Sequence, residues 1–176
     1  MNFSPGRKNK PQKYILPMGK ILVDISRQRL TLFGDDGNAE KEYPCSTSRF
    51  GPGNAEGSEK TPVGLHRIAE KYGDGEPLGM IFSSREPTGK TAAVNHSPTP
   101  SGADLITTRI LRLEGLQPGL NKGRGIDSYE RYIYIHGTPE EGLIGTPASH
   151  GCIRMKNDDI AELYPLCPVG LTVEII

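Results

Sequence analysis

The sequence predicts a mainly β single domain, a β-sandwich or partly closed barrel with one or two short helices. The 22 glycines and 15 prolines disfavour a helical bundle, because both residues interrupt helices. Stretches in which every second side chain is apolar recur along the chain, as in strands with one buried face. A length of 176 residues suits one domain with its own core.

The first 50 residues are expected to form an antiparallel meander. Residues 20–33 hold two alternating stretches separated by a turn over 26–29. A turn cluster at 34–38 leads into another strand over 40–46. The apolar positions of the first two strands are Ile21, Val23, Ile25, Leu30 and Leu32.

The rest of the chain is expected to add loops, strands and one helix. Residues 49–62 form a Gly- and Pro-rich loop, and residues 74–100 are broken by the same residue types. A helix is expected over 157–167, with Asn157 or Asp158 as its cap. Pro165 ends this helix. Further strands are expected over 63–73, 106–116, 131–137 and 170–176.

The charge and cysteine content exclude several classes of function. Because 21 basic residues balance 21 acidic ones, nothing predicts the electrostatic attraction that supports nucleic-acid binding. Three cysteines are an odd number in a chain of this size, so at least one thiol should be free. Cys45 and Cys167 are expected in or near the core. Cys152 is then the thiol left for chemistry.

The N-terminal segment bears on domain organisation and on location. Residues 1–19, rich in proline and basic side chains, are expected to form an arm or lead-in strand before a domain over 20–176. The chain has no apolar run long enough for a signal peptide or an integral membrane segment. If Met1 is the native start, the protein is expected in the cytoplasm. If an export signal was removed, it is expected in the periplasm or cell envelope.

The candidate catalytic residues lie between Tyr132 and Met155. His136 follows a strongly β segment, and Cys152 lies further on in the run SHGCIR. A thiol is a useful nucleophile only as the thiolate, and a neighbouring imidazole is expected to lower the pKa of the thiol by stabilising the ion pair. A strand–loop–strand excursion can bring His136 back beside Cys152. His150, two residues before the thiol, would share a face with it in an extended segment.

Three neighbours of the thiol have further expected roles. Gly151 permits an unusual dihedral, so that its N–H and that of Cys152 can point at a developing oxyanion. Arg154 offers a fixed fork to a substrate carboxylate, or it pairs with Asp158 or Asp159. Other residues that could line a groove are Thr61, Tyr72 and Tyr134.

The arrangement of His136 followed by SHGCIR resembles the signature of the L,D-transpeptidase (YkuD-type) catalytic domain. In that signature a histidine is followed at a similar distance by Ser/Thr-His-Gly-Cys and then Asn or Arg. Upstream, VDISRQRLTLF, EYPCSTS and EKTPVGLHRIAEK resemble successive strands of the same domain. The resemblance extends over residues 20–176.

This resemblance implies a role for each residue of the motif. Cys152 would be the acylated nucleophile and His136 its general base, oriented by a main-chain carbonyl such as that of Gly137. Gly151 and Cys152 would form the oxyanion hole, and His150 would shape the site. Residues expected to contact substrate are Ser149, Arg154 and Tyr134.

The resemblance also implies the substrate class. Family members attack the carbonyl of the third residue, commonly diaminopimelate, in tetrapeptide stems of peptidoglycan, and D-Ala leaves. The thioester then passes to an amine, as in an L,D-transpeptidase, or to water, as in an L,D-carboxypeptidase, which a cytoplasmic member would favour. Stem peptides or muropeptides are the expected partners, and carbapenems the expected covalent inhibitors. No metal and no organic cofactor are implied.

Two other classes of function remain as alternatives. A zinc-binding β domain could use His136, His150 and Cys152, but the sequence offers neither a fourth ligand nor a paired ligand motif. A non-catalytic peptidoglycan-binding module would be expected to have lost the thiol or its base, and this chain has both.

Overall fold

The computed structural model describes residues 19–176. The expected N-terminal arm falls almost wholly on residues 1–18, which lie outside this part. Within it, ten strands accompany one α-helix, α1 (Asn157–Leu163), and two short 3₁₀ helices, η1 (Glu141–Leu143) and η2 (Tyr164–Leu166). The strands are β1 (Lys20–Asp24), β2 (Arg29–Phe33), β3 (Ala39–Pro44), β4 (Gly64–Tyr72), β5 (Met80–Ser83), β6 (Glu86–Thr91), β7 (Ile106–Gly115), β8 (Tyr134–Gly137), β9 (Ile153–Met155) and β10 (Thr172–Ile175).

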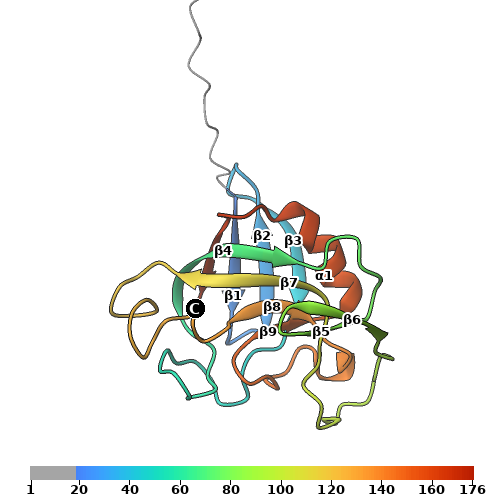
Figure 1. Cartoon of the computed structure of the whole chain (residues 1–176). Coiled ribbons are helices and arrows are strands. Elements are labelled where there is room, and N and C mark those ends of the chain that lie inside the picture. The colour runs from blue at the N-terminus through green and yellow to red at the C-terminus, as the bar shows by residue number, and fades with distance from the viewer. Residues whose placement is uncertain (1–18) are drawn as a thin grey trace, which may run out of the picture.

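All ten strands belong to one sheet that folds over on itself. The strand order is β3-β2-β1-β10-β4-β7-β5-β6, and β8 pairs with both β7 and β9. The pairs β1–β10 and β8–β9 are parallel, and the others are antiparallel. In Figure 1, β4 and β7 cross in front of β1, β2 and β3. Over the described residues the strand order does not return to its start, so the sheet is not closed. The expected mainly β domain is confirmed.

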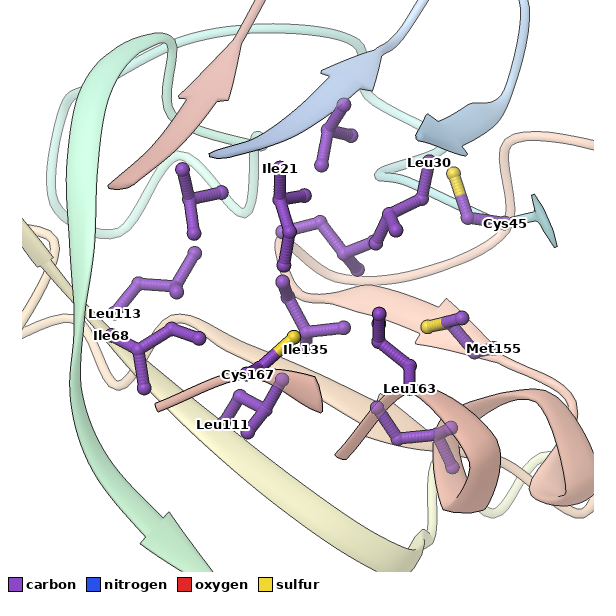
Figure 2. Packing of buried hydrophobic residues seen from close by; sticks show 14 of the residues in the cluster. Ile21, Leu30, Cys45, Ile68, Leu111, Leu113, Ile135, Met155, Leu163 and Cys167 are labelled. Carbon is purple, nitrogen blue, oxygen red and sulfur yellow. The ribbon is translucent and has the colours of Figure 1, made fainter. Parts of the chain in front are cut away.

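The main core fills the space inside the folded sheet. Figure 2 shows Ile21 and Leu30 facing Leu111 and Ile135 across this interior, and all four are fully buried. Burying such aliphatic side chains stabilises the fold by about 1.5–3 kcal/mol each. The cysteines Cys45 and Cys167 also lie in this core with no exposed surface, as expected. No helix in residues 19–176 combines the length and the apolar character needed to cross a membrane.

The expected meander of β1, β2 and β3 is confirmed, but the hairpin of β5 and β6 inside residues 74–100 is not predicted by the sequence. A two-residue turn, Ser84 and Arg85, joins the two strands with φ values of 47° and 70°. Two positive φ values are typical of a type I′ turn, which favours Asn-Gly. Every residue of β6 is exposed, and the strand contains Pro87. Neither an alternation of apolar and polar residues nor typical turn residues therefore predict this hairpin.

The expected helix is present, but its start differs from the prediction. Neither Asn157 nor Asp158 is the N-cap of α1. The N-cap is Lys156, and its side chain makes no capping hydrogen bond. A carboxylate from η1 serves instead, since the N–H of Asn157 donates to Glu141 Oε1 at 2.9 Å. The α-helix ends at Leu163 and continues as η2, which contains Pro165.

The buried side chain of Asn157 joins α1 to two neighbouring segments. Its Nδ2 donates to the carbonyl of Thr138 at 3.0 Å and to Glu141 Oε1 at 2.8 Å. Its Oδ1 accepts from the hydroxyls of Thr107 at 2.7 Å and Thr108 at 2.5 Å. These bonds connect α1 to β7 and to Thr138, which follows β8. The expected catalytic histidine, His136, belongs to β8.

We expect Asn157→Ala to lower the free energy of unfolding by about 2–3 kcal/mol, because it leaves several buried donors and acceptors without partners. Urea denaturation followed by circular dichroism measures the change. Asp158→Ala is the matched control on the same turn: its side chain is exposed, and a loss of only about 0.5 kcal/mol is expected. Equal losses in the two variants would contradict the role assigned to Asn157.

Candidate active site

His136 and Cys152 lie on or beside two neighbouring parallel strands. In the β8–β9 pair, Ile135 lies opposite Ile153 and His136 lies opposite Arg154. Ile135 and Ile153 belong to the main core, so the alternate side chains of the two strands face away from it. Cys152, immediately before β9, packs in a second apolar cluster on that other face. The predicted strand–loop–strand excursion is confirmed.

The imidazole of His136 has a defined tautomer. Its Nδ1 lies 2.7 Å from the carbonyl oxygen of Gly137, the hydrogen bond expected from the sequence. Because a carbonyl only accepts, Nδ1 carries the proton and Nε2 keeps its lone pair. Burial lowers the pKa of His136 to about 4. The ring is therefore a neutral acceptor near pH 7.

The thiol of Cys152 is partly exposed and contacts main-chain groups of Tyr132 and Tyr134. The N–H of Tyr134 donates to Sγ at 3.4 Å, and the thiol lies 3.5 Å from the carbonyl oxygen of Tyr132. Burial raises the pKa of Cys152 to about 12, against the lowering effect of the Tyr134 N–H. Thiol and imidazole are thus both neutral in the free protein.

Hydrogen bonds hold the loop that carries the thiol. Gly151 has a φ of 128°, the unusual dihedral expected for it. Its carbonyl accepts from Thr61 Oγ1 at 2.9 Å, and its N–H donates to Ser149 Oγ at 3.2 Å. The Ser149 hydroxyl donates to the carbonyl of Cys152 at 2.6 Å. Ser149 and Thr61 are buried supports of the loop, and the oxyanion role of the Gly151 N–H stays a prediction.

His150 is exposed and is bonded to partners other than the thiol. Its Nε2 lies 2.8 Å from a guanidinium nitrogen of Arg49, and its Nδ1 lies 2.9 Å from Asp104 Oδ2. Because Arg49 only donates, Nε2 accepts and Nδ1 donates to Asp104. His150 therefore shapes the surface beside Cys152.

Two surface hollows meet at His150. One, of about 330 Å³, is lined by residues that include Arg49, Asp104 and Leu143. The other, of about 320 Å³, is lined by residues that include Glu59, Arg131 and Tyr132. His150 lines both hollows, and Cys152 lines neither of them.

Arg154 does not pair with Asp158 or Asp159, and that expected alternative is wrong. Its guanidinium forms an ion pair with Glu140 and lies 3.8 Å from Asp104. Only 1% of the surface of Arg154 is exposed to solvent. Glu140 comes from the loop between β8 and β9, which turns under the strand and brings its carboxylate to the guanidinium. The role of Arg154 in binding substrate stays a prediction, and its charge is already neutralised inside the protein.

Sequence reasoning missed two charged groups near the thiol. Arg131 lowers the pKa of Cys152 and Asp104 raises it. Both come from loops with no recognisable motif, so only the three-dimensional arrangement identifies them. The candidate groove residue Tyr134 is buried, and its hydroxyl accepts from Arg85 at 3.2 Å.

The zinc alternative does not agree with the arrangement of the site. His136 directs Nδ1 to a carbonyl, and His150 is exposed between Arg49 and Asp104. Among residues 19–176 no group of three or more His, Cys, Asp or Glu side chains is placed to hold a metal ion. His136, with its fixed tautomer, and Cys152 lie on the same face of β8 and β9, and their role in base-assisted nucleophilic attack stays a prediction.

Comparison with known proteins identifies the family. The sequence model of the L,D-transpeptidase catalytic domain (YkuD) matches residues 19–175. The protein named probable L,D-transpeptidase ErfK/SrfK of Escherichia coli is 29% identical over 174 residues, which cover 94% of this chain and 47% of that protein. A relative from Fuscovulum blasticum, named for the same family, is 51% identical over 130 residues, covering 70% of this chain and 61% of the relative.

Solved structures show the same fold at low sequence identity. L,D-transpeptidase 3 of Mycobacterium tuberculosis with a faropenem-derived adduct aligns with a TM-score of 0.57 and 18% identity, covering 90% of this chain and 60% of that one. LdtMt1 in complex with imipenem aligns with a TM-score of 0.54 and 18% identity, covering 91% and 59%. This chain belongs to the L,D-transpeptidase (YkuD) family, and it spans about half the length of ErfK/SrfK.

We expect Cys152 to react slowly with iodoacetamide near neutral pH, because burial raises its pKa to about 12 and only the thiolate attacks. The rate should rise about tenfold per pH unit, as the thiolate fraction does well below the pKa. Peptide mass spectrometry measures the rate, with the buried Cys45 and Cys167 as internal controls. A fast rate that does not change between weakly acidic and neutral pH would indicate a preformed thiolate–imidazolium pair.

We expect Arg154→Met to lower the free energy of unfolding by about 3 kcal/mol or more, because it leaves the buried Glu140 carboxylate without its partner. Chemical denaturation measures the loss. Arg49→Met is the control, since Arg49 is exposed at the other end of the same chain of contacts. Unchanged stability together with an increased KM would favour direct substrate binding by Arg154 instead.

Proposed function

We propose that this protein is an L,D-transpeptidase that uses Cys152 as nucleophile and His136 as general base. The observation that carries the proposal is the hydrogen bond from His136 Nδ1 to the Gly137 carbonyl, which leaves the Nε2 lone pair as the proton acceptor. His136 and Cys152 share the face of β8 and β9 that lies away from the main core. Family membership supports a peptidoglycan stem as the substrate.

The proposed first half-reaction forms a thioester. Sγ of Cys152 attacks the carbonyl of the third stem residue while His136 Nε2 takes the thiol proton. The tetrahedral intermediate collapses, the C–N bond to D-Ala breaks, and His136 returns the proton to the leaving amine. One proton therefore passes from the thiol to His136 and then to the leaving amine. This fits an imidazole whose pKa is lowered and a thiol whose pKa is raised by burial.

Main-chain N–H groups beside Sγ would stabilise the intermediate. The N–H of Tyr134 donates to Sγ in the free protein, so it stabilises negative charge on sulfur as the proton leaves. The N–H of Cys152, and that of Gly151 once released from Ser149, are the donors of the proposed oxyanion hole. Preorganised donors of this kind lower the barrier because they need no reorientation during the reaction.

The proposed second half-reaction passes the acyl group to an amine of another stem peptide. The two hollows that share His150 are the candidate places for the donor and acceptor stems in this proposal. His136 Nε2 takes a proton from the acceptor amine, which attacks the thioester, and the thiol is regenerated. The imipenem and faropenem complexes of other family members support carbapenems as covalent inhibitors at Cys152.

We expect the purified protein to convert a disaccharide-tetrapeptide and a second amine-bearing stem into a dimer joined through the third residue, with release of D-Ala. Mass spectrometry of the products measures this. His136→Ala should slow the reaction by about 10²-fold or more, through loss of the general base. Cys152→Ala should form no product while keeping the circular dichroism spectrum of the folded domain.

Imipenem is the independent probe of the thiol. A stoichiometric adduct on the intact protein, mapped to Cys152 and absent in Cys152→Ala, is expected. Formation of tripeptide alone, with no dimer, would replace transpeptidation by L,D-carboxypeptidase activity. Product formation by Cys152→Ala would rule out the nucleophile.

A further inference from the structure

The turn of the β5–β6 hairpin carries a strained arginine. Arg85 has a φ of 70° in the second turn position, where glycine is favoured. Tyr132, whose ring lies under the Arg85 guanidinium, also has a positive φ, 54°. Two non-glycine residues in this region, in contact with each other, are a costly arrangement that clusters at functional sites.

Arg85 is held by the same residues that hold the thiol. Its guanidinium lies 5.4 Å from the ring centroid of Tyr132 and 6.0 Å from that of Tyr72. One of its nitrogens donates to the hydroxyl of Tyr134 at 3.2 Å. The main-chain groups of Tyr132 and Tyr134 contact Cys152 Sγ. Tyr132 and Tyr134 therefore contact the guanidinium through their side chains and the thiol through their main chains.

The charge of Arg85 has no anionic partner in the described part of the chain. No Asp or Glu oxygen of residues 19–176 lies within ion-pair distance of it. The neighbouring arginines are engaged differently. Arg112 pairs with Glu70, Arg154 pairs with Glu140, Arg49 contacts His150, and Arg131 donates to the carbonyls of Gly53 and Lys60.

Stacking also leaves most of the guanidinium edge available. The aromatic contacts of Arg85 are with ring faces, and its hydrogen-bond partners are tyrosine hydroxyls, Tyr134 Oη at 3.2 Å among them, whereas a guanidinium has five N–H donors. A carboxylate is the anion whose two oxygens match the remaining fork. The half-buried position and the aromatic neighbours reduce the competition from water.

We propose that Arg85 binds a carboxylate of the acyl donor beside the scissile bond and so determines donor specificity. This inference rests on the proposed function. A stem tetrapeptide offers two such carboxylates, the terminal one of D-Ala and the free one of a diaminopimelate-like third residue. The other candidate for a substrate carboxylate, Arg154, is buried and ion-paired with Glu140, whereas Arg85 has no carboxylate partner among the described residues.

The test compares donors in which one carboxylate at a time is replaced by an amide. For the wild-type protein, amidation of the recognised carboxylate should lower kcat/KM by about tenfold or more, the size of one charge-assisted contact. Arg85→Gln should lower kcat/KM for the free-acid donor by a similar factor and cause no further loss with that amide. The donor that shows this loss of discrimination identifies which carboxylate is bound.

Two variants serve as controls. Arg27→Gln changes an exposed arginine in the turn between β1 and β2 and should retain the wild-type preference for acid over amide. Arg85→Lys keeps the charge but loses the fork, and it should recover only part of the preference. Equal losses of Arg85→Gln on acid and amide donors, or no loss on either, would overturn the proposal.

Binding measurements separate this proposal from the proposed function. Calorimetry of the donors with Cys152→Ala, with and without Arg85→Gln, needs no turnover. We expect Arg85→Gln to weaken binding of the acid donor by about tenfold and to leave binding of the amide donor unchanged. If the protein turns over no donor, but Arg85→Gln still weakens binding of the acid donor alone, the catalytic proposal fails and the carboxylate site stands. If binding is insensitive to Arg85, the carboxylate site fails.

Discussion

The parallel pairing of β8 with β9 is the constraint on which the site depends. Parallel neighbours need a crossover, and here residues 138–152 make it with only the short η1 as regular structure. Main-chain hydrogen bonds also hold β9 on the side away from β8, because the N–H and the carbonyl of Arg154 both bond to Ser46, at 2.8 Å each. β9 is thus held between β8 and the end of the meander. Any change in that register would move Cys152 relative to His136.

Buried charges below the site have a second effect, on the state of the thiol. Glu140 neutralises Arg154, so the guanidinium lends little positive potential to Cys152. Asp104 further disfavours the thiolate, while Arg131 favours it. The free protein therefore keeps a neutral thiol and a neutral imidazole, and negative charge appears at sulfur only as the proton moves. A thiol in this state reacts slowly with electrophiles, because only the thiolate attacks.

The sequence predicts those parts of the fold and site that depend on local patterns. Alternating residues predict β1, β2 and β4, and the SHGC run with His136 upstream identifies the thiol and the imidazole. Long-range contacts have no such signal. Glu140 reaches Arg154, and Glu141 reaches the start of α1, only because the crossover loop folds under β9. The Ser84–Arg85 turn escaped prediction because its positive φ values are imposed by tertiary contacts rather than by residue preference.

Over residues 19–176 the sheet does not close: its main strand path ends in two edges, β3 and β6, and β9 branches off through β8. Unpaired main-chain groups on such edges are templates on which another molecule can add a strand. Both edges contain a proline and charged side chains: Glu40, Lys41, Glu42 and Pro44 on β3, and Glu86, Pro87 and Lys90 on β6. Proline lacks the donor that a ladder needs, and the charges repel a like-charged neighbour and are costly to bury against an apolar one. These side chains therefore disfavour association with another molecule through β3 and β6.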